Sequence, residues 1–249
     1  MKIDVVVTST CRKTVEKTVE SFLDKLYLSE EFNFIVNVDV KNPGYLPTLE
    51  KYFKRKNIND VHINHHPARP PKGQADAVNY LYNKLNAPYY FNLEDDWIFL
   101  KTINLDALIE VMEKNEDIDI IKLNRMRIPE ESWLYHLSPS SAPLTGMNSN
   151  QSMGNLNLVK THNWSFNPSL VRTATIKKML PVEFTGTKKL SPPSNAEKYF
   201  CHTYDHMFSK RGAFFLGCIG DPPIIRDIGR NKWKVYRRRL KKFLWAQNS

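Results

Sequence analysis

The feature that most constrains the fold is a regular alternation of short β-branched runs with amphipathic helical segments. Residues 3–7 read IDVVV, and Val15, Val19 and Phe22 then recur at the spacing of one helix face. Further strands are expected at 34–40, 61–64, 89–93 and 118–123, and helices at 47–56, 75–85 and 105–112. This order predicts an α/β fold with a mostly parallel central sheet, right-handed crossovers and helices on both faces.

The second half of the chain is less regular. Residues 125–163 are polar and rich in Ser, Asn and Pro, which is typical of a lid or binding loop. Later strands are expected at 164–170 and 213–219, and helices at 171–179 and 196–210. Since no linker or repeat divides the chain, we expect a single domain over residues 1–249.

Composition favours a cytoplasmic globular protein. Hydrophobic residues make up 41% of the chain and charged residues 25%, and no run approaches the roughly 20 apolar residues of a membrane span. The apolar run at the start is too short for a signal peptide. The three cysteines form no CxxC pair, which favours reduced thiols.

Positive charge is concentrated near the end of the chain. Seven of the net +10 charges come from one stretch without an acid, and removing them leaves +3. Because aromatic and leucine residues recur among them at near-helical spacing, residues 231–249 are expected to form a basic amphipathic helix. It would pack on the domain, lie on an anionic membrane surface as a peripheral anchor, or bind nucleic acid, which is the least favoured of the three. The seven residues are Lys232, Lys234, Arg237, Arg238, Arg239, Lys241 and Lys242.

Polar residues follow three of the expected strands. Thr8-Ser9-Thr10-Cys11-Arg12 follows the first, Asp39 ends the second, and Glu94-Asp95-Asp96 follows the fourth. The carboxyl ends of parallel strands are where α/β sheets bind ligands. Three adjacent carboxylates repel one another, and a hard cation such as Mg²⁺ or Mn²⁺ would offset that charge. The alternative is a solvated acidic turn or a helix cap.

These segments resemble the GT-A fold glycosyltransferases, most closely the family 2-like inverting enzymes. The similar stretches are TSTCRKTVEKTVESF, GQADAVNYLYNKLNAPYYFNLEDDW and NWSFNPSLVR. Gly73, Ala77 and Asn79 match the Gly-x-x-x-Ala-x-Asn segment that precedes the family's metal-binding strand end. The resemblance covers residues 1 to about 125 well and the remainder loosely.

The resemblance implies a role for each matching position. Asp96 would be the first metal ligand and Glu94 the second, with Mn²⁺ or Mg²⁺ as the cofactor. Asp39 would contact the base or the ribose. The residues implied to line the nucleotide-sugar pocket are Thr8, Ser9, Arg12, Asp39, Gln74, Asp76, Asn79 and Asp95.

The general base would come from the second half of the chain. Inverting transfer needs a carboxylate to deprotonate the acceptor hydroxyl. Glu197 is preferred, at an expected helix start, and Asp205 is the second candidate. The family often completes its metal site with a histidine near the last strand. Here Cys218 or Asp221 occupies that stretch, and because a thiolate is a poor Mg²⁺ ligand, Asp221 or the substrate would fill the place.

Several of these residues also have structural interpretations. Residues 8–10 could cap the helix that follows, and Arg12 could pair with Glu16. Asp76 and Glu197 could be helix-dipole partners, and Asp39 an ordinary turn residue.

The sequence thus predicts a metal-dependent glycosyltransferase that moves a sugar from a nucleoside diphosphate sugar to a hydroxyl acceptor, with inversion. The acceptor would be a glycan or a lipid-linked or protein-linked hydroxyl. Residues 1–125 would bind the nucleotide-sugar, 126–230 would carry the acceptor side and the lid loop, and 231–249 the basic helix. A sugar-nucleotide nucleotidyltransferase and a basic nucleic-acid-binding module are the alternatives. The first usually carries a Gly-rich loop after its first strand, which TSTCRKT lacks.

Overall fold

One nine-stranded sheet forms the centre of the computed structural model, which describes residues 2–68, 72–128, 149–153, 155–161, 166–182, 203–204, 207 and 212–229. The strand order is β4-β3-β1-β5-β11-β8-β12-β10-β9. The strands are β1 (Ile3–Ser9), β3 (Phe32–Asp39), β4 (Asp60–Asn64), β5 (Tyr89–Glu94), β8 (Ile118–Lys122), β9 (Ser149–Met153), β10 (Leu156–Thr161), β11 (Ser169–Arg172) and β12 (Gly212–Leu216).

The order in which the chain adds strands to the sheet changes direction after β4. From β1 the chain moves outward to β3 and β4, all parallel, and then returns to β5 on the other side of β1. β11 lies antiparallel between β5 and β8, and β12 runs parallel to β8. The boundary between β1 and β5 is therefore a topological switch point, where sheets of this kind leave a crevice for ligands.

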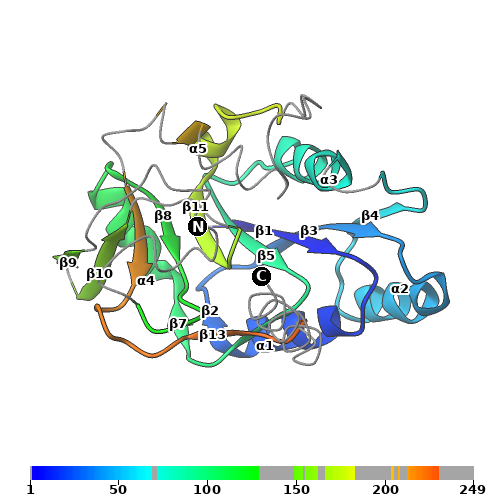
Figure 1. Cartoon of the computed structure of the whole chain (residues 1–249), viewed down its shortest axis with the longest axis horizontal. Helices are drawn as coiled ribbons and strands as arrows, with labels where there is room; N and C mark the ends of the chain where they lie inside the picture. Colours follow the sequence, from blue (N-terminus) through cyan, green and yellow to red (C-terminus); the bar gives the residue numbers. More distant parts are fainter. Residues whose placement is uncertain are drawn as a thin grey trace, which may run out of the picture.

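Helices cover both faces of the sheet, as the sequence predicts. In Figure 1, α3 and α5 lie above the sheet, and α1 and α2 lie below it with the short strands β2, β7 and β13. The helices are α1 (Thr14–Lys25), η1 (Pro43–Tyr45), α2 (Leu46–Arg55), α3 (Lys72–Asn83), α4 (Leu105–Lys114) and α5 (Thr173–Lys177). Two small sheets join β2 (Leu26–Tyr27) to β7 (Ile103–Asn104) and β6 (Trp97–Phe99) to β13 (Ile225–Asp227).

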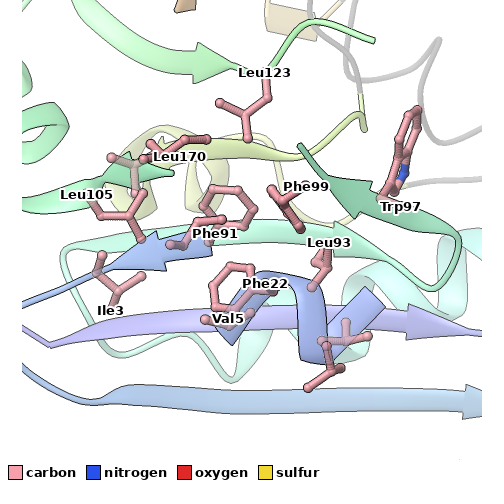
Figure 2. Packing of buried hydrophobic residues seen from close by; sticks show 14 of the residues in the cluster. Ile3, Val5, Phe22, Phe91, Leu93, Trp97, Phe99, Leu105, Leu123 and Leu170 are labelled. Carbon is pink, nitrogen blue, oxygen red and sulfur yellow. The ribbon is translucent and has the colours of Figure 1, made fainter. Parts of the chain in front are cut away.

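The core explains why β1 carries the continuous apolar run Val5-Val6-Val7. Val5 and Val7 pack into the cluster on the α1 side, whereas Val6 packs into the cluster under α3 and α5, so both faces of β1 are buried. Phe22 of α1 meets Phe91 of β5 edge-on, with ring centroids 5.2 Å apart, and Phe99 of β6 at 5.6 Å (Figure 2). These contacts hold α1 under the strands whose ends carry the polar residues.

The second half departs from the sequence prediction. The expected strand at 164–170 is instead β11, shifted to Ser169–Arg172, and the expected helix at 171–179 shrinks to the single turn of α5. Residues 125–163, predicted as an irregular loop, contain the antiparallel strands β9 and β10. The sequence of β9, SNQSM, is polar because this strand lies at the edge of the sheet, and that of β10, LNLVKT, next to it, mixes polar and apolar residues, so the apolar alternation is weak.

Two predictions fall on residues outside this description. The expected helix at 196–210 is described only at residues 203–204 and 207, and the basic segment 231–249 not at all. Among the described residues, no helix has the length and apolarity needed to cross a membrane.

Candidate functional site

A cavity of about 290 Å³ opens at the switch point, between the carboxyl ends of β3, β1 and β5 and the first half of α3. We call it the polar cavity, because most of the residues that line it are polar. These polar residues are Thr8, Ser9, Thr10, Arg12, Asn37, Asp39, Lys41, Gln74, Asn92, Glu94, Asp95 and Asp96. Eight of the predicted site residues thus meet around one space, in addition to four that were not predicted.

The register of the parallel strands gathers these side chains. Thr8 of β1 lies beside Asn37 of β3 on one side and beside Glu94 of β5 on the other. In-register residues of parallel strands face the same side of the sheet, and so do residues two apart along a strand. Asp39, two residues after Asn37, and Asn92, two before Glu94, therefore extend the same polar surface.

Helix α3 forms one wall of the cavity, and a glycine in its first turn allows its close packing. A Cβ atom at Gly73 would lie 2.3 Å from the carbonyl oxygen of Ala68, so only glycine allows the first turn to approach that backbone. Gln74 and Ala77 line the cavity from the same helix. Because the N-terminal turn of a helix presents unpaired N–H groups and a partial positive charge, this edge of the cavity favours an anion.

Asp95 is the anchor of the loop after β1. Its carboxylate is 2% exposed and accepts hydrogen bonds at 2.8 Å from both the Ser9 hydroxyl and the Thr10 backbone N–H. Arg12 forms an ion pair with both of its oxygens. The resemblance implies that Asp95 contacts the nucleotide; in the structure, both of its oxygens hold the β1 loop in place.

Two structural interpretations of this loop are wrong. The N-cap of α1 is Lys13, and no side chain caps it, so residues 8–10 are not helix caps. Arg12 pairs with Asp95 and Asp96, whereas Glu16 accepts a hydrogen bond from the Tyr45 hydroxyl. The strand end β5 attracts Arg12 because it concentrates three carboxylates.

Asp96 is partly buried in a crowded acidic region. Burial raises the pKa of its carboxyl group; Arg12 opposes this, and the charges of Asp95 and Asp227 add to it. Its Oδ2 lies 3.3 Å from the Arg12 guanidinium, and its backbone oxygen accepts the Ile228 N–H at 2.8 Å. A Cβ atom at Gly229 would lie 2.1 Å from Asp96 Oδ2, so the segment after β13 packs directly on this carboxylate.

The donor set of the cavity fits a hard divalent cation. Glu94 and Asp96 both line it, and Mg²⁺ or Mn²⁺ is usually held by one or two carboxylates together with substrate phosphates and water. The desolvated Asp96 carboxylate with acids beside it is a group that a cation would stabilise. No group of three His, Cys, Asp or Glu side chains with metal-binding geometry occurs among the described residues, so phosphate and water would have to complete the coordination.

Asp39 belongs to an amide cluster on the far side of the cavity. Its Oδ1 accepts hydrogen bonds from the side-chain amides of Asn37 and Asn64, each at 3.2 Å. Lys41 follows it at the cavity wall. Asp39 is thus held in position by side chains of β3 and β4, whereas an ordinary turn residue would not need these two hydrogen bonds.

Some predicted site residues lie elsewhere. Asp76 is exposed and does not line the polar cavity, and it lies beyond the first turn of α3. Asn79 also lies off the cavity: its amide donates to the Val182 carbonyl at 3.1 Å and accepts the Val182 N–H at 2.8 Å. Asp221 lines a different hollow. Glu197 and Asp205 are outside the described residues.

Besides Thr10 of the polar segment after β1, the sequence interpretation missed Asn37, Lys41, Asn92 and Phe166. Asn92 donates to the Phe166 carbonyl at 2.7 Å and accepts from the Tyr82 hydroxyl at 3.1 Å, and it stands between the apolar residues Phe91 and Leu93 of β5. The signal was present: Asn37-x-Asp39 and Asn92-x-Glu94 place the same polar pattern at the ends of two strands. An amide in a buried strand marks a face that meets something polar.

Comparisons with known proteins support the fold. No protein-family model and no curated protein sequence matches the chain. Among solved structures, the mannosyltransferase PcManGT from Pyrobaculum calidifontis, in complex with GDP-Man and Mn²⁺, matches with a TM-score of 0.56 and 10% identity, over 94% of this chain and 60% of that one. The fold is of the GT-A type.

Two structures of S. aureus TarS lead to the same fold. The structure of its residues 1–349 has a TM-score of 0.51 and 15% identity, over 86% of this chain and 60% of that one. The complex with UDP-GlcNAc has a TM-score of 0.51 and 14% identity, over 93% and 59%. The chain therefore spans about 60% of the length of these structures.

Proposed function

We propose that this chain is a glycosyltransferase that takes a nucleoside diphosphate sugar as donor and transfers the sugar to a hydroxyl acceptor. The observation that carries the proposal is the polar cavity at the switch point of a GT-A fold. Structures with the same fold hold GDP-Man with Mn²⁺ in one case and UDP-GlcNAc in another. A second observation agrees: the cavity combines carboxylates at the end of β5 with cations and a helix N-terminus, the charges that a diphosphate and its metal need.

Different residues of the polar cavity would contact different parts of the donor. Asp39, held by Asn37 and Asn64, would accept hydrogen bonds from the base or the ribose. The first turn of α3 would face the diphosphate, together with the Lys41 ammonium. Thr8 and Asn92 lie in the row between them and would contact the ribose and sugar hydroxyls.

Glu94 and Asp96 would hold Mn²⁺ or Mg²⁺ at the end of β5. When bound, the ion would stabilise the negative charge on the departing diphosphate. Arg12 already lies against Asp96, so it would either remain as a second positive charge beside the diphosphate or turn toward a phosphate oxygen.

Inversion at the sugar carbon requires a base on the acceptor side, and Glu197 is our proposal for that base, with Asp205 second. The Glu197→Gln variant is expected to bind donor normally while transfer stops, because an amide cannot take the acceptor proton. Retained turnover in the variant would assign the base to another residue.

Thermal unfolding of the full chain tests the donor and the metal together. With GDP-Man or UDP-GlcNAc at about 100 times its Kd, binding adds about 2.7 kcal/mol and raises Tm by about 5–10 °C. Omitting Mn²⁺ is expected to remove most of this rise. The Asp96→Ala variant should show the small, metal-independent rise only.

The matched control is Asp24→Ala, an exposed acid on α1 that pairs only with the neighbouring Lys25 among the described residues. It should respond to donor and Mn²⁺ like the unmodified chain. An Asp96→Ala variant that kept the full Mn²⁺-dependent rise would contradict the metal assignment. No rise with any nucleoside diphosphate sugar would contradict the donor class.

The two alternatives make different predictions. A sugar-nucleotide nucleotidyltransferase would bind a nucleoside triphosphate and a sugar phosphate, so the same Tm assay with those ligands separates it. For nucleic acid, the basic segment 231–249 would bind with a steep salt dependence. We propose a cytoplasmic location, with that segment at an anionic membrane surface; its deletion should reduce binding to anionic vesicles without unfolding the domain.

A further inference from the structure

A second hollow lies on the opposite face of the sheet from the polar cavity. It measures about 240 Å³ and lies where β7, the end of β8 and the strands β10 and β12 meet. Its floor is apolar: Ile103, Leu156, Leu216 and Ile224 all belong to, or pack against, the core cluster on the α1 side. No residue lines both spaces. In Figure 1, β7 lies below the sheet and α3 above it.

A buried polar atom at this hollow has no partner. Asn124 is fully buried and follows β8. Its amide nitrogen donates to the backbone carbonyls of Met126 at 3.0 Å and Pro222 at 3.0 Å, but its Oδ1 accepts no hydrogen bond within the described part of the chain. An unsatisfied buried carbonyl is costly, about 1–3 kcal/mol, so this oxygen favours a hydrogen-bond donor that the described residues do not supply.

Asp221 supplies a second acceptor beside it. Its Oδ2 accepts the Cys218 N–H at 2.8 Å, which leaves the other carboxylate oxygen without a hydrogen bond among the described residues. Gly217, at φ +115°, makes room for it, because a Cβ atom there would lie 2.6 Å from Asp221 Oδ2. The left-handed glycine thus serves to bring a carboxylate to the rim of the hollow.

The rim also carries groups that can both donate and accept. Asn155 and Asn157 reach it from β10 and the turn before it. A ligand that fits must therefore donate hydrogen bonds to Asn124 and Asp221 and exchange hydrogen bonds with the two rim amides. It must also place an apolar surface against the floor. Lys101 and Asp221 both line the hollow, so it carries no net charge that would favour an ion, and an apolar molecule would leave Asn124 unsatisfied.

We propose that this second hollow binds a neutral, hydroxyl-rich ligand the size of one sugar ring, at a site separate from the donor cavity. Its volume of about 240 Å³ has room for a single ring. Sugar hydroxyls donate and accept, and the C–H face of a ring suits an apolar floor. The proposal does not depend on the chemistry of the polar cavity.

Ligand-observed NMR on the full chain tests this site, with methyl mannoside, N-acetylglucosamine and glycerol as probes. We expect weak, saturable binding of at least one sugar, and no comparable binding of glycerol, since an open-chain polyol cannot cover the floor. The Asp221→Asn variant keeps an acceptor for Cys218 but loses the charge, and should weaken binding about tenfold.

Two further variants locate the binding. Asn157→Ala, at an exposed rim position, should also weaken it without a folding defect, which unfolding curves would verify. Asp39→Asn, in the polar cavity, should leave it unchanged. Binding that follows Asp39 instead of Asp221, equal binding of glycerol, or no saturable signal with any probe would each overturn the proposal; the last would mean that water alone satisfies Asn124.

Discussion

In the polar cavity, the buried side chains of Asp95 and Asn92 are hydrogen-bonded to neighbouring residues. At the second hollow, by contrast, a buried amide oxygen has no partner among the described residues. Asp95 has Ser9, Thr10 and Arg12, and Asn92 has Tyr82 and Phe166. Asn124 Oδ1 and, on the neighbouring strand β11, Ser169 Oγ have none within the described part of the chain.

The difference teaches how the two regions use polar groups. A satisfied network is rigid, and it fixes the geometry that a charged donor and a metal would need. An unsatisfied group lowers stability and is retained most readily where a ligand or water completes it. Substitutions that remove one polar group at a time can therefore break or sharpen this contrast.

The largest effect is expected at Asp95. The Asp95→Ala change removes the acceptor of two hydrogen bonds and the partner of Arg12, and should lower the free energy of unfolding by about 3 kcal/mol. Urea denaturation measures it. Asp96→Ala, next in sequence but more exposed, should cost less than about 1 kcal/mol. Equal losses in the two variants would mean that Asp95 is not the anchor.

A smaller effect is expected at Asn79. Its amide makes two hydrogen bonds with the Val182 backbone, so Asn79→Ala should cost about 2 kcal/mol in unfolding free energy. Asp76→Ala, an exposed position on the same helix, should stay within about 0.5 kcal/mol. A donor-binding defect with unchanged stability in Asn79→Ala would instead support the nucleotide contact that the sequence resemblance implies.

The smallest effects come from a pair of buried serines, one bonded to Asp95 at the polar cavity and one on β11 without a partner among the described residues. Ser9→Ala removes a hydroxyl that donates to Asp95, and should cost about 1.5 kcal/mol. Ser169→Ala removes a hydroxyl without a partner among the described residues, so it should be neutral or stabilise by up to about 1 kcal/mol. Thermal or urea unfolding of both decides the comparison. If Ser169→Ala is as destabilising as Ser9→Ala, the contrast between satisfied and unsatisfied polar groups fails.

The sequence predicts the first half well because its signals are local. The strand ends at Ser9, Asp39 and Glu94 follow from apolar runs, and parallel topology brings them together. The separate roles of Asp95 and Asp96 could not be predicted, because they depend on the turn after β5, which directs one carboxylate into the β1 loop and leaves the other at the cavity.

The second half depends on contacts that no local pattern records. β11 inserts antiparallel between β5 and β8, and the pairing of Ser169 with Asn92 and Lys122 is set by strand order. Asp221 was a candidate ligand for the acidic strand end because it stands in the stretch where the resembled family often has a histidine, yet the structure places it, beside the left-handed Gly217, at the second hollow.

The close approach of Gly229 to Asp96 couples the last described residues to the end of β5. An ion bound at the end of β5 would lie close to the backbone of residues 227–229, because this segment packs directly on Asp96. Binding of the ion should therefore change the environment of these residues. A spectroscopic label near Ile228 would therefore act as a gauge of occupancy at a site some 130 residues away in sequence.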